Sequence, residues 1–70
     1  MLKFGDVLRP LMKQRGMSLE DIAGKTDIGI SKMYLIVYGT QEPTLLETRR
    51  IAVAIGVSID YLCWMREGGD

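Results

Sequence analysis

The sequence predicts an all-α protein built from five short helices. Two observations indicate this: apolar residues recur at helical spacing between glycines, and Ser18, Thr44 and Ser58 stand where helix N-caps are expected. The run YLIVY (34–38) is rich in residues that favour strands. Because the chain contains no second run of this kind, a strand there would lack a partner, and we assign the run to a helix.

The first predicted helix covers residues 2–15 and ends at Gly16, which suits the position after a helix C-terminus. Pro10 lies inside this helix, where it removes a backbone donor and should kink or loosen the helix locally. The apolar face is predicted to comprise Phe4, Val7, Leu8 and Leu11.

The second and third predicted helices are separated by a tight turn. The second covers residues 19–25, with Ser18 as N-cap and Asp21 three residues later, as in a capping box. Ile22 and Ala23 should face inward. After a turn at 26–29, the third helix covers residues 30–38 and stops at Gly39.

The fourth and fifth predicted helices follow a loop at 39–43. Thr44 and Glu47 form a T-x-x-E capping box for the fourth helix, which ends at Gly56. Ser58 caps the fifth helix, residues 59–66, and residues 68–70 should fray. The fourth helix is expected to bury Leu45, Ile51, Ala52 and Ile55.

Composition narrows the class of protein further. A chain of 70 residues predicts a single domain, residues 1–70, and the formal net charge of zero is unusual for a nucleic-acid binder. We expect a cytoplasmic protein without a membrane segment. With no histidine and only Cys63, we expect no metal, cofactor or disulfide, and a half-buried thiol. The sequence shows neither a pair of carboxylates nor a phosphate-binding loop of the kind that an active site uses, so we expect no enzymatic activity and no small-molecule substrate.

Several short motifs occur in a characteristic order. They are G-x-S at 16–18, E-D-I-A at 20–23, inward positions Ile28, Met33 and Ile36, Gly39 followed by Pro43, and IAVAIGVSIDYL at 51–62. With these motifs, residues 4–62 resemble the Cro and phage-repressor family of helix-turn-helix proteins. The resemblance implies a lambda-repressor-like DNA-binding domain, with the helix-turn-helix at about 18–38 and the third helix reading operator DNA.

The chain departs from this family at the positions that would face DNA. Leu19 stands where the family commonly has a phosphate-binding Gln, and the loop after the third helix offers Thr40, Gln41 and Glu42 instead of basic residues. Met12 and Val37 replace a partly buried Arg–Glu pair of the family. Because both charges are replaced together, we interpret these two residues as a matched apolar pair.

The third helix has an unusually apolar outer face, for which three interpretations remain open. It reads DNA, with Ile30 and Leu35 on thymine methyls and Ser31 and Lys32 on base edges or phosphates. It binds protein, either another helix-turn-helix repressor, for which this protein is a modulator or antirepressor, or a second copy. Or it packs under the chain's own Trp64 and Met65. The predicted recognition surface, for DNA or protein, comprises Leu19, Ile30, Ser31, Lys32, Tyr34, Leu35, Tyr38, Thr40 and Gln41.

Two further features bear on partners. Lys3, Arg9, Lys13 and Arg15 cluster on the first helix and would assist DNA binding only if that helix approaches the duplex. The fifth helix is apolar on several sides, which is typical of a buried helix or of one in a homodimer interface. The candidate dimer residues are Ile59, Leu62, Cys63, Trp64 and Met65.

Overall fold

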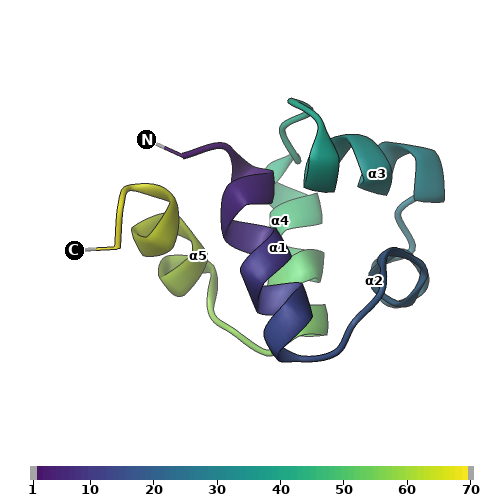
Figure 1. Ribbon diagram of the computed structural model, residues 1–70, viewed down its shortest axis with the longest axis horizontal. Coiled ribbons are helices and arrows are strands. Elements are labelled where there is room, and N and C mark those ends of the chain that lie inside the picture. Colours follow the sequence, from purple (N-terminus) through teal and green to yellow (C-terminus); the bar gives the residue numbers. More distant parts are fainter. Residues whose placement is uncertain (1, 70) are drawn as a thin grey trace.

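The computed structural model describes residues 2–69, and this part of the chain forms five α-helices without a strand, as predicted (Figure 1). The run at 34–38 is helical, so the lone-strand alternative is excluded. Helix boundaries agree with the predictions to within two residues. The helices are α1 (Phe4–Gln14), α2 (Leu19–Thr26), α3 (Ile30–Tyr38), α4 (Leu45–Ile55) and α5 (Ile59–Arg66).

The predicted helix caps form as the sequence suggests. Ser18 and Asp21 exchange two hydrogen bonds: the Ser18 hydroxyl accepts from the Asp21 backbone N–H at 3.0 Å, and the Asp21 carboxylate accepts from the Ser18 N–H at 2.9 Å. Thr44 and Glu47 repeat this arrangement at 3.1 and 2.9 Å. Each pair satisfies backbone donors that a helix start leaves unpaired, which fixes where α2 and α4 begin.

Helix α1 continues through Pro10, contrary to the expected local disruption. Phe4 to Gln14 form one helix, and Pro10 is exposed on its outer side. The donor that Pro10 lacks would have bonded the carbonyl of Asp6, one turn earlier. Because this side of α1 faces solvent, water can satisfy that carbonyl, and the helix is not broken.

Among residues 2–69, fifteen buried apolar side chains form the core, and they come from all five helices and the turn before α3. Helix α1 packs against α3 and α5, and α2 packs against α3 and α4 (Figure 1). None of the helices within residues 2–69 is long and apolar enough to cross a bilayer. The buried residues are Phe4, Val7, Leu8, Leu11, Met12, Ile22, Ala23, Ile28, Met33, Ile36, Val37, Ile51, Ala52, Ile55 and Leu62.

One predicted core residue is wrong. Leu45 is 73% exposed, whereas Ile51, Ala52 and Ile55 of the same helix are buried. These three residues all lie in the second half of α4, while Leu45 is its first residue, directly after the cap Thr44. The helical period predicts a face but not how far along the helix axis a small core extends.

The end of α3 lies directly against the start of α1. A Cβ atom on Gly5 would overlap the carbonyl oxygen of Val37 and would lie 2.8 Å from that of Ile36. Arg9 strengthens this junction because its guanidinium donates to the Val37 carbonyl oxygen at 2.6 Å and to the Asp6 carboxylate at 2.6 Å. The contact therefore sets the position of α3 relative to α1.

Met12 and Val37 are both buried, with 6% and 0% of their surface exposed. Both therefore lie in the core, as the prediction of an apolar pair requires. No ionised side chain is left in the low-polarity interior at either position, so the fold avoids the cost of desolvating a charge there.

Candidate nucleic-acid interface

The turn between α2 and α3 is held by buried contacts. The hydroxyl of Thr26 donates to the Ile22 carbonyl oxygen at 2.7 Å and accepts from the backbone N–H of Ile28 at 3.4 Å. Asp27 adopts the left-handed conformation with φ of 60°, which Asp tolerates better than most residues. The inward positions proposed for the helix-turn-helix, Ile22, Ala23, Ile28, Met33 and Ile36, are all buried.

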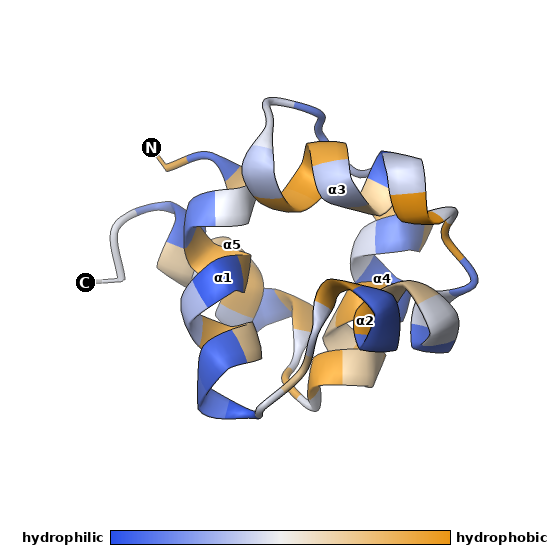
Figure 2. Ribbon diagram, turned by 45° about the vertical axis from the view of Figure 1, so that its right-hand side comes forward, coloured by the Kyte–Doolittle hydropathy of each residue, from blue (hydrophilic) through white to orange (hydrophobic). Residues whose placement is uncertain are grey.

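The outer face of α3 is apolar and exposed. We call the set Ile30, Tyr34, Leu35 and Tyr38 the apolar stripe; these side chains are 47%, 55%, 48% and 57% exposed. The rings of Tyr34 and Tyr38 lie 5.3 Å apart, centroid to centroid, so the two aromatic residues form a continuous surface. Figure 2 shows α3 at the edge of the molecule in orange and pale shades, with little of the strong blue seen on α1.

The C-terminal segment does not cover the apolar stripe, so that interpretation is wrong. Trp64 is 48% exposed and lies against Tyr61, with ring centroids 5.9 Å apart. Met65 instead packs against the core. Helix α5 packs on α1 and α4 (Figure 1). Within residues 2–69, the stripe therefore remains open to solvent.

A shallow groove runs between the start of α2 and the apolar stripe. Its volume is about 430 Å³, and Leu19, Ile30, Ser31, Tyr34 and Leu35 line it. Leu19 therefore lies beside the stripe, across this groove. The polar side-chain groups that line this groove are the hydroxyls of Ser31 and Tyr34, neither of them ionised, so the surface suits an apolar ligand group more than a charged one.

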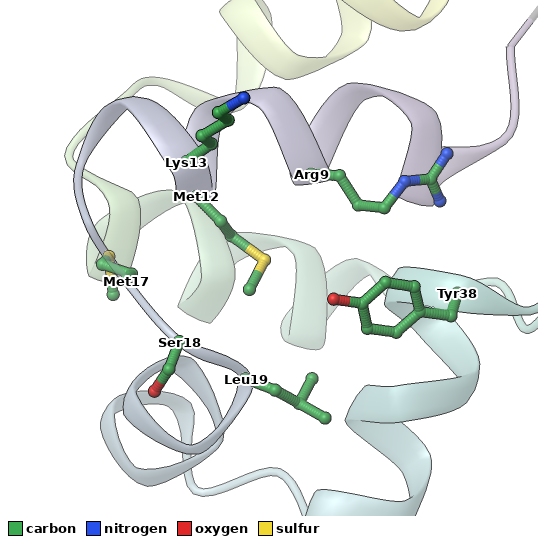
Figure 3. Close-up of a pocket in the computed structure, with 7 residues that line it drawn as sticks. All are labelled: Arg9, Met12, Lys13, Met17, Ser18, Leu19 and Tyr38. Atoms are coloured by element: carbon green, nitrogen blue, oxygen red, sulfur yellow. The ribbon is translucent and has the colours of Figure 1, made fainter.

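A second, smaller hollow lies beside the first, at the junction of α1, α2 and α3. Its volume is about 190 Å³; Tyr38 of the stripe lines it, and so does Leu19, which also lines the first groove. Figure 3 shows Met12, Leu19 and the Tyr38 hydroxyl directed into the space between the three helices, with Arg9 extending along α1 and the Lys13 ammonium directed away from that space. The lining residues are Arg9, Met12, Lys13, Met17, Ser18, Leu19 and Tyr38.

This hollow places two basic residues of α1 beside the predicted recognition surface. Lys13 is exposed, and the Arg9 side chain is 40% exposed. The sequence showed both on the first helix, but only the packing of α1 against α3 brings them next to Tyr38. Arg15, in contrast, donates to the Ile55 carbonyl oxygen at 2.6 Å and thereby ties α1 to α4.

Lys32, the one basic residue of α3, is engaged by a neighbouring helix. Its ammonium lies 2.7 Å from a carboxylate oxygen of Glu47 on α4. The Lys32 ammonium and the backbone N–H of Thr44 both donate to this carboxylate, which lowers the pKa of Glu47. Lys32 thus lies on the flank of α3 that faces α4, and its charge is neutralised there rather than presented on the outer face.

The loop after α3 adds little positive charge. Thr40 and Gln41 are exposed, and the Gln41 amide donates to the Glu42 carbonyl oxygen at 3.4 Å. The Glu42 carboxylate lies 2.5 Å from the guanidinium of Arg66 on α5. The repulsion that Glu42 would exert on a phosphate is therefore reduced by its own ion pair.

The structure separates the predicted dimer residues of α5 into two groups. Leu62 is 1% exposed and belongs to the core, and Ile59 and Met65 pack against the core. Cys63 and Trp64 are exposed. The expectation of a half-buried thiol is thus wrong, because Cys63 follows Leu62 and lies off the single buried line of α5. Of the predicted dimer residues, Cys63 and Trp64 are the exposed ones, Ile59 and Met65 are partly exposed, and Leu62 is buried.

Neither a search of curated proteins nor a search of solved structures found a match to this chain. Within residues 2–69, no three His, Cys, Asp or Glu side chains cluster as metal ligands would. A family model described as a helix-turn-helix domain matches residues 3–62, which includes all of α1 to α4 and half of α5. Such domains are typical of DNA-binding regulators. The chain therefore belongs to the helix-turn-helix domain family.

Proposed function

We propose that this protein is a small transcription regulator of the phage or prophage type that binds operator DNA through α3. The observation that carries the proposal is the family match, combined with an outer face of α3 that is open to solvent. In helix-turn-helix proteins the second helix of the motif enters the major groove while the first crosses the phosphate backbone. Here these helices are α3 and α2.

In this arrangement, phosphate contacts come from α1. Lys13 and Arg9 both border the hollow between α1, α2 and α3, which Tyr38 also lines. Lys32 is paired with Glu47, so it contributes no net charge. Arg9 is likewise paired, with Asp6 at 2.6 Å. With Lys13 as the unpaired cation at this hollow, the logarithm of affinity should fall with the logarithm of salt concentration at a slope of roughly −1.

Fluorescence anisotropy with random-sequence duplex DNA across a salt series tests this proposal. We expect binding at low salt, with a shallow slope near the value above. Lys13→Gln should reduce the slope by about one, because each neutralised phosphate contributes about 0.9. Lys25→Gln is the matched control, because Lys25 borders a different hollow with Arg49 and Arg50. Absence of binding at low salt, or equal effects of the two substitutions, would contradict the proposal.

A second candidate function is favoured by the exposed fraction of the apolar stripe. Its four side chains are 47–57% exposed and contiguous, which is uncommon on a monomer that has no partner. In this alternative the protein is a modulator or antirepressor, and the stripe covers the reading helix of another helix-turn-helix repressor. The specific result expected is that the purified protein releases such a repressor from its operator, and that Tyr34→Ala and Leu35→Ala abolish this release.

Homodimerisation is a separate part of the proposal. Helix-turn-helix dimers bind two operator half-sites about one helical turn apart, which increases affinity without adding cations to each subunit. The exposed α5 side chains Cys63 and Trp64 are the proposed contact. Sedimentation equilibrium should show a dimer that Trp64→Ala weakens; a monomer at all concentrations would exclude this contact.

A further inference from the structure

The outer face of α3 carries no ionised group. Lys32 is the one charged residue between positions 30 and 38, and it lies on the flank toward α4, paired with Glu47 at 2.7 Å. The exposed face consists of the apolar stripe and the small hydroxyl of Ser31. Apart from the hydroxyls of Ser31, Tyr34 and Tyr38, which do not single out one base, a DNA sequence preference of this face would therefore arise from apolar contacts.

The major groove offers few groups of this kind. Guanine is commonly read by Arg or Lys, adenine by Asn or Gln, and cytosine by Asp or Glu. None of these residue types lies on the outer face of α3. The thymine C5-methyl is the apolar feature that the standard bases present in the major groove, and aliphatic side chains contact it directly.

We propose that α3 reads thymine methyl groups, so that the preferred DNA is an A·T-rich duplex recognised through apolar contacts. This inference rests on the proposed function as a DNA-binding protein. Ile30 and Leu35 are the aliphatic members of the stripe, and both line the groove next to Leu19. A methyl group inserted there contacts apolar side chains from both α2 and α3.

The spacing of these two residues fits the spacing of base pairs. Five residues along a helix correspond to a rise of about 7.5 Å at 1.5 Å per residue. Successive base pairs are about 3.4 Å apart along the duplex, so this rise corresponds to roughly two base-pair steps. With the α3 axis running along the duplex axis, these two side chains would therefore meet thymines about two base pairs apart.

The test compares duplexes that differ only in this methyl group. Anisotropy at low salt is measured on an A·T-rich duplex and on the same duplex with deoxyuridine in place of thymidine, which keeps the base-pair hydrogen bonds. We expect the affinity to fall roughly fourfold for each contacted methyl removed, the ratio that corresponds to burying one methyl-sized group. Replacing cytosine by 5-methylcytosine in a G·C-rich duplex should raise affinity by a similar ratio.

Variants assign the effect to the stripe. Ile30→Ala combined with Leu35→Ala should bring the thymidine-to-deoxyuridine affinity ratio to about one while leaving the salt slope unchanged. Val53→Ala is the matched control, because Val53 is an aliphatic residue, 77% exposed on α4, that borders the hollow containing Lys25. It should keep the wild-type ratio. Since the comparison of duplexes uses the wild-type protein, it stands even if the double variant is unstable.

The outcomes separate this inference from the proposed function. Salt-dependent binding with equal affinity for thymidine and deoxyuridine duplexes would overturn methyl recognition but leave DNA binding intact. A ratio that survives in the Ile30→Ala and Leu35→Ala variant would likewise overturn the assignment to α3. Absence of binding to every duplex at low salt would overturn both and would favour a protein partner for the stripe.

Discussion

Replacing Gly5 by alanine should destabilise the protein, although helix propensity alone predicts the opposite. Gly5 lies in the first turn of α1, where alanine is favoured over glycine by about 1 kcal/mol. However, a Cβ there would overlap the Val37 carbonyl oxygen and lie 2.8 Å from the Ile36 oxygen. These are backbone atoms of a packed helix, so they cannot move aside separately, and α1 and α3 must move apart.

The magnitude follows from the contacts that this movement disturbs. Overpacking of a well-packed site costs about 1–3 kcal/mol. Loss of the hydrogen bond from Arg9 to the Val37 carbonyl, 2.6 Å in a partly buried setting, adds about 1 kcal/mol. After subtracting the gain of about 1 kcal/mol in helix propensity, we expect a net loss of roughly 1–3 kcal/mol.

Urea denaturation followed by circular dichroism measures this change, and α2 supplies a matched control. Gly24 also lies inside a helix, but a Cβ there would meet nothing within 4 Å. Gly24→Ala should therefore stabilise the protein by about 1 kcal/mol, or about 4–8 °C in Tm for a domain of this size. If Gly5→Ala stabilises as much as Gly24→Ala, the close approach of α1 to α3 described here is wrong.

Three further predictions follow from the core and from the charged groups at the helix ends. Val37→Glu should lower the free energy of unfolding, measured in a urea melt, by about 3–5 kcal/mol, because it leaves an unpaired charge in the core. Adding Met12→Arg should recover most of that loss. Equal stability of the single variant and wild type would place Val37 outside the core. The pKa values of Asp21 and Glu47 are lowered below 3.8 and 4.5, so their stabilisation is present above those values and is lost as the pH falls through the lower folded-state values. The urea midpoint should therefore fall on acidification below about pH 4.5, and less so in an Asp21→Asn, Glu47→Gln variant. Finally, Glu47→Gln should release Lys32 and steepen the salt dependence of DNA binding by about 0.9 in slope; an unchanged slope would mean that Lys32 does not reach phosphate.

Local sequence signals predicted the helices because their physical causes are local. A capping box requires a hydroxyl and a carboxylate three residues apart, and Ser18 with Asp21 forms one in the structure. The helical period likewise placed Met33, Ile36 and Val37 inside and left Tyr34 and Tyr38 outside. Each of these signals depends only on residues that lie within one or two helical turns of each other in the sequence.

Features that depend on tertiary distance could not be predicted in this way. The engagement of Lys32 by Glu47 joins residues fifteen positions apart on different helices, and nothing near either residue indicates it. The close approach of the Val37 carbonyl to Gly5 depends on the path of α3, whereas the sequence around Gly5 indicates only a helix. Leu45 has a core-like residue type, but it stands at the start of α4, where it is 73% exposed.

The scarcity of charged side chains beside α3, compared with its apolar outer face, determines how such a regulator would distinguish its operator from other DNA. Phosphate contacts bind every sequence equally and weaken as salt rises, whereas contacts to thymine methyls contribute only where the sequence places them. A protein that offers phosphate about one unpaired cation, and whose α3 has an uncharged outer face, should therefore have little affinity for random DNA. Under the proposed mode of binding, its preference for a matched site over random DNA would depend mainly on Ile30 and Leu35, whose apolar contacts salt screening does not weaken. If α3 reads DNA as proposed, absolute affinity should fall gently as salt rises while the ratio of matched to random affinity stays nearly constant. If α3 instead recognised its site through the charge of Lys32, both the absolute affinity and the ratio of matched to random affinity would fall as salt rises.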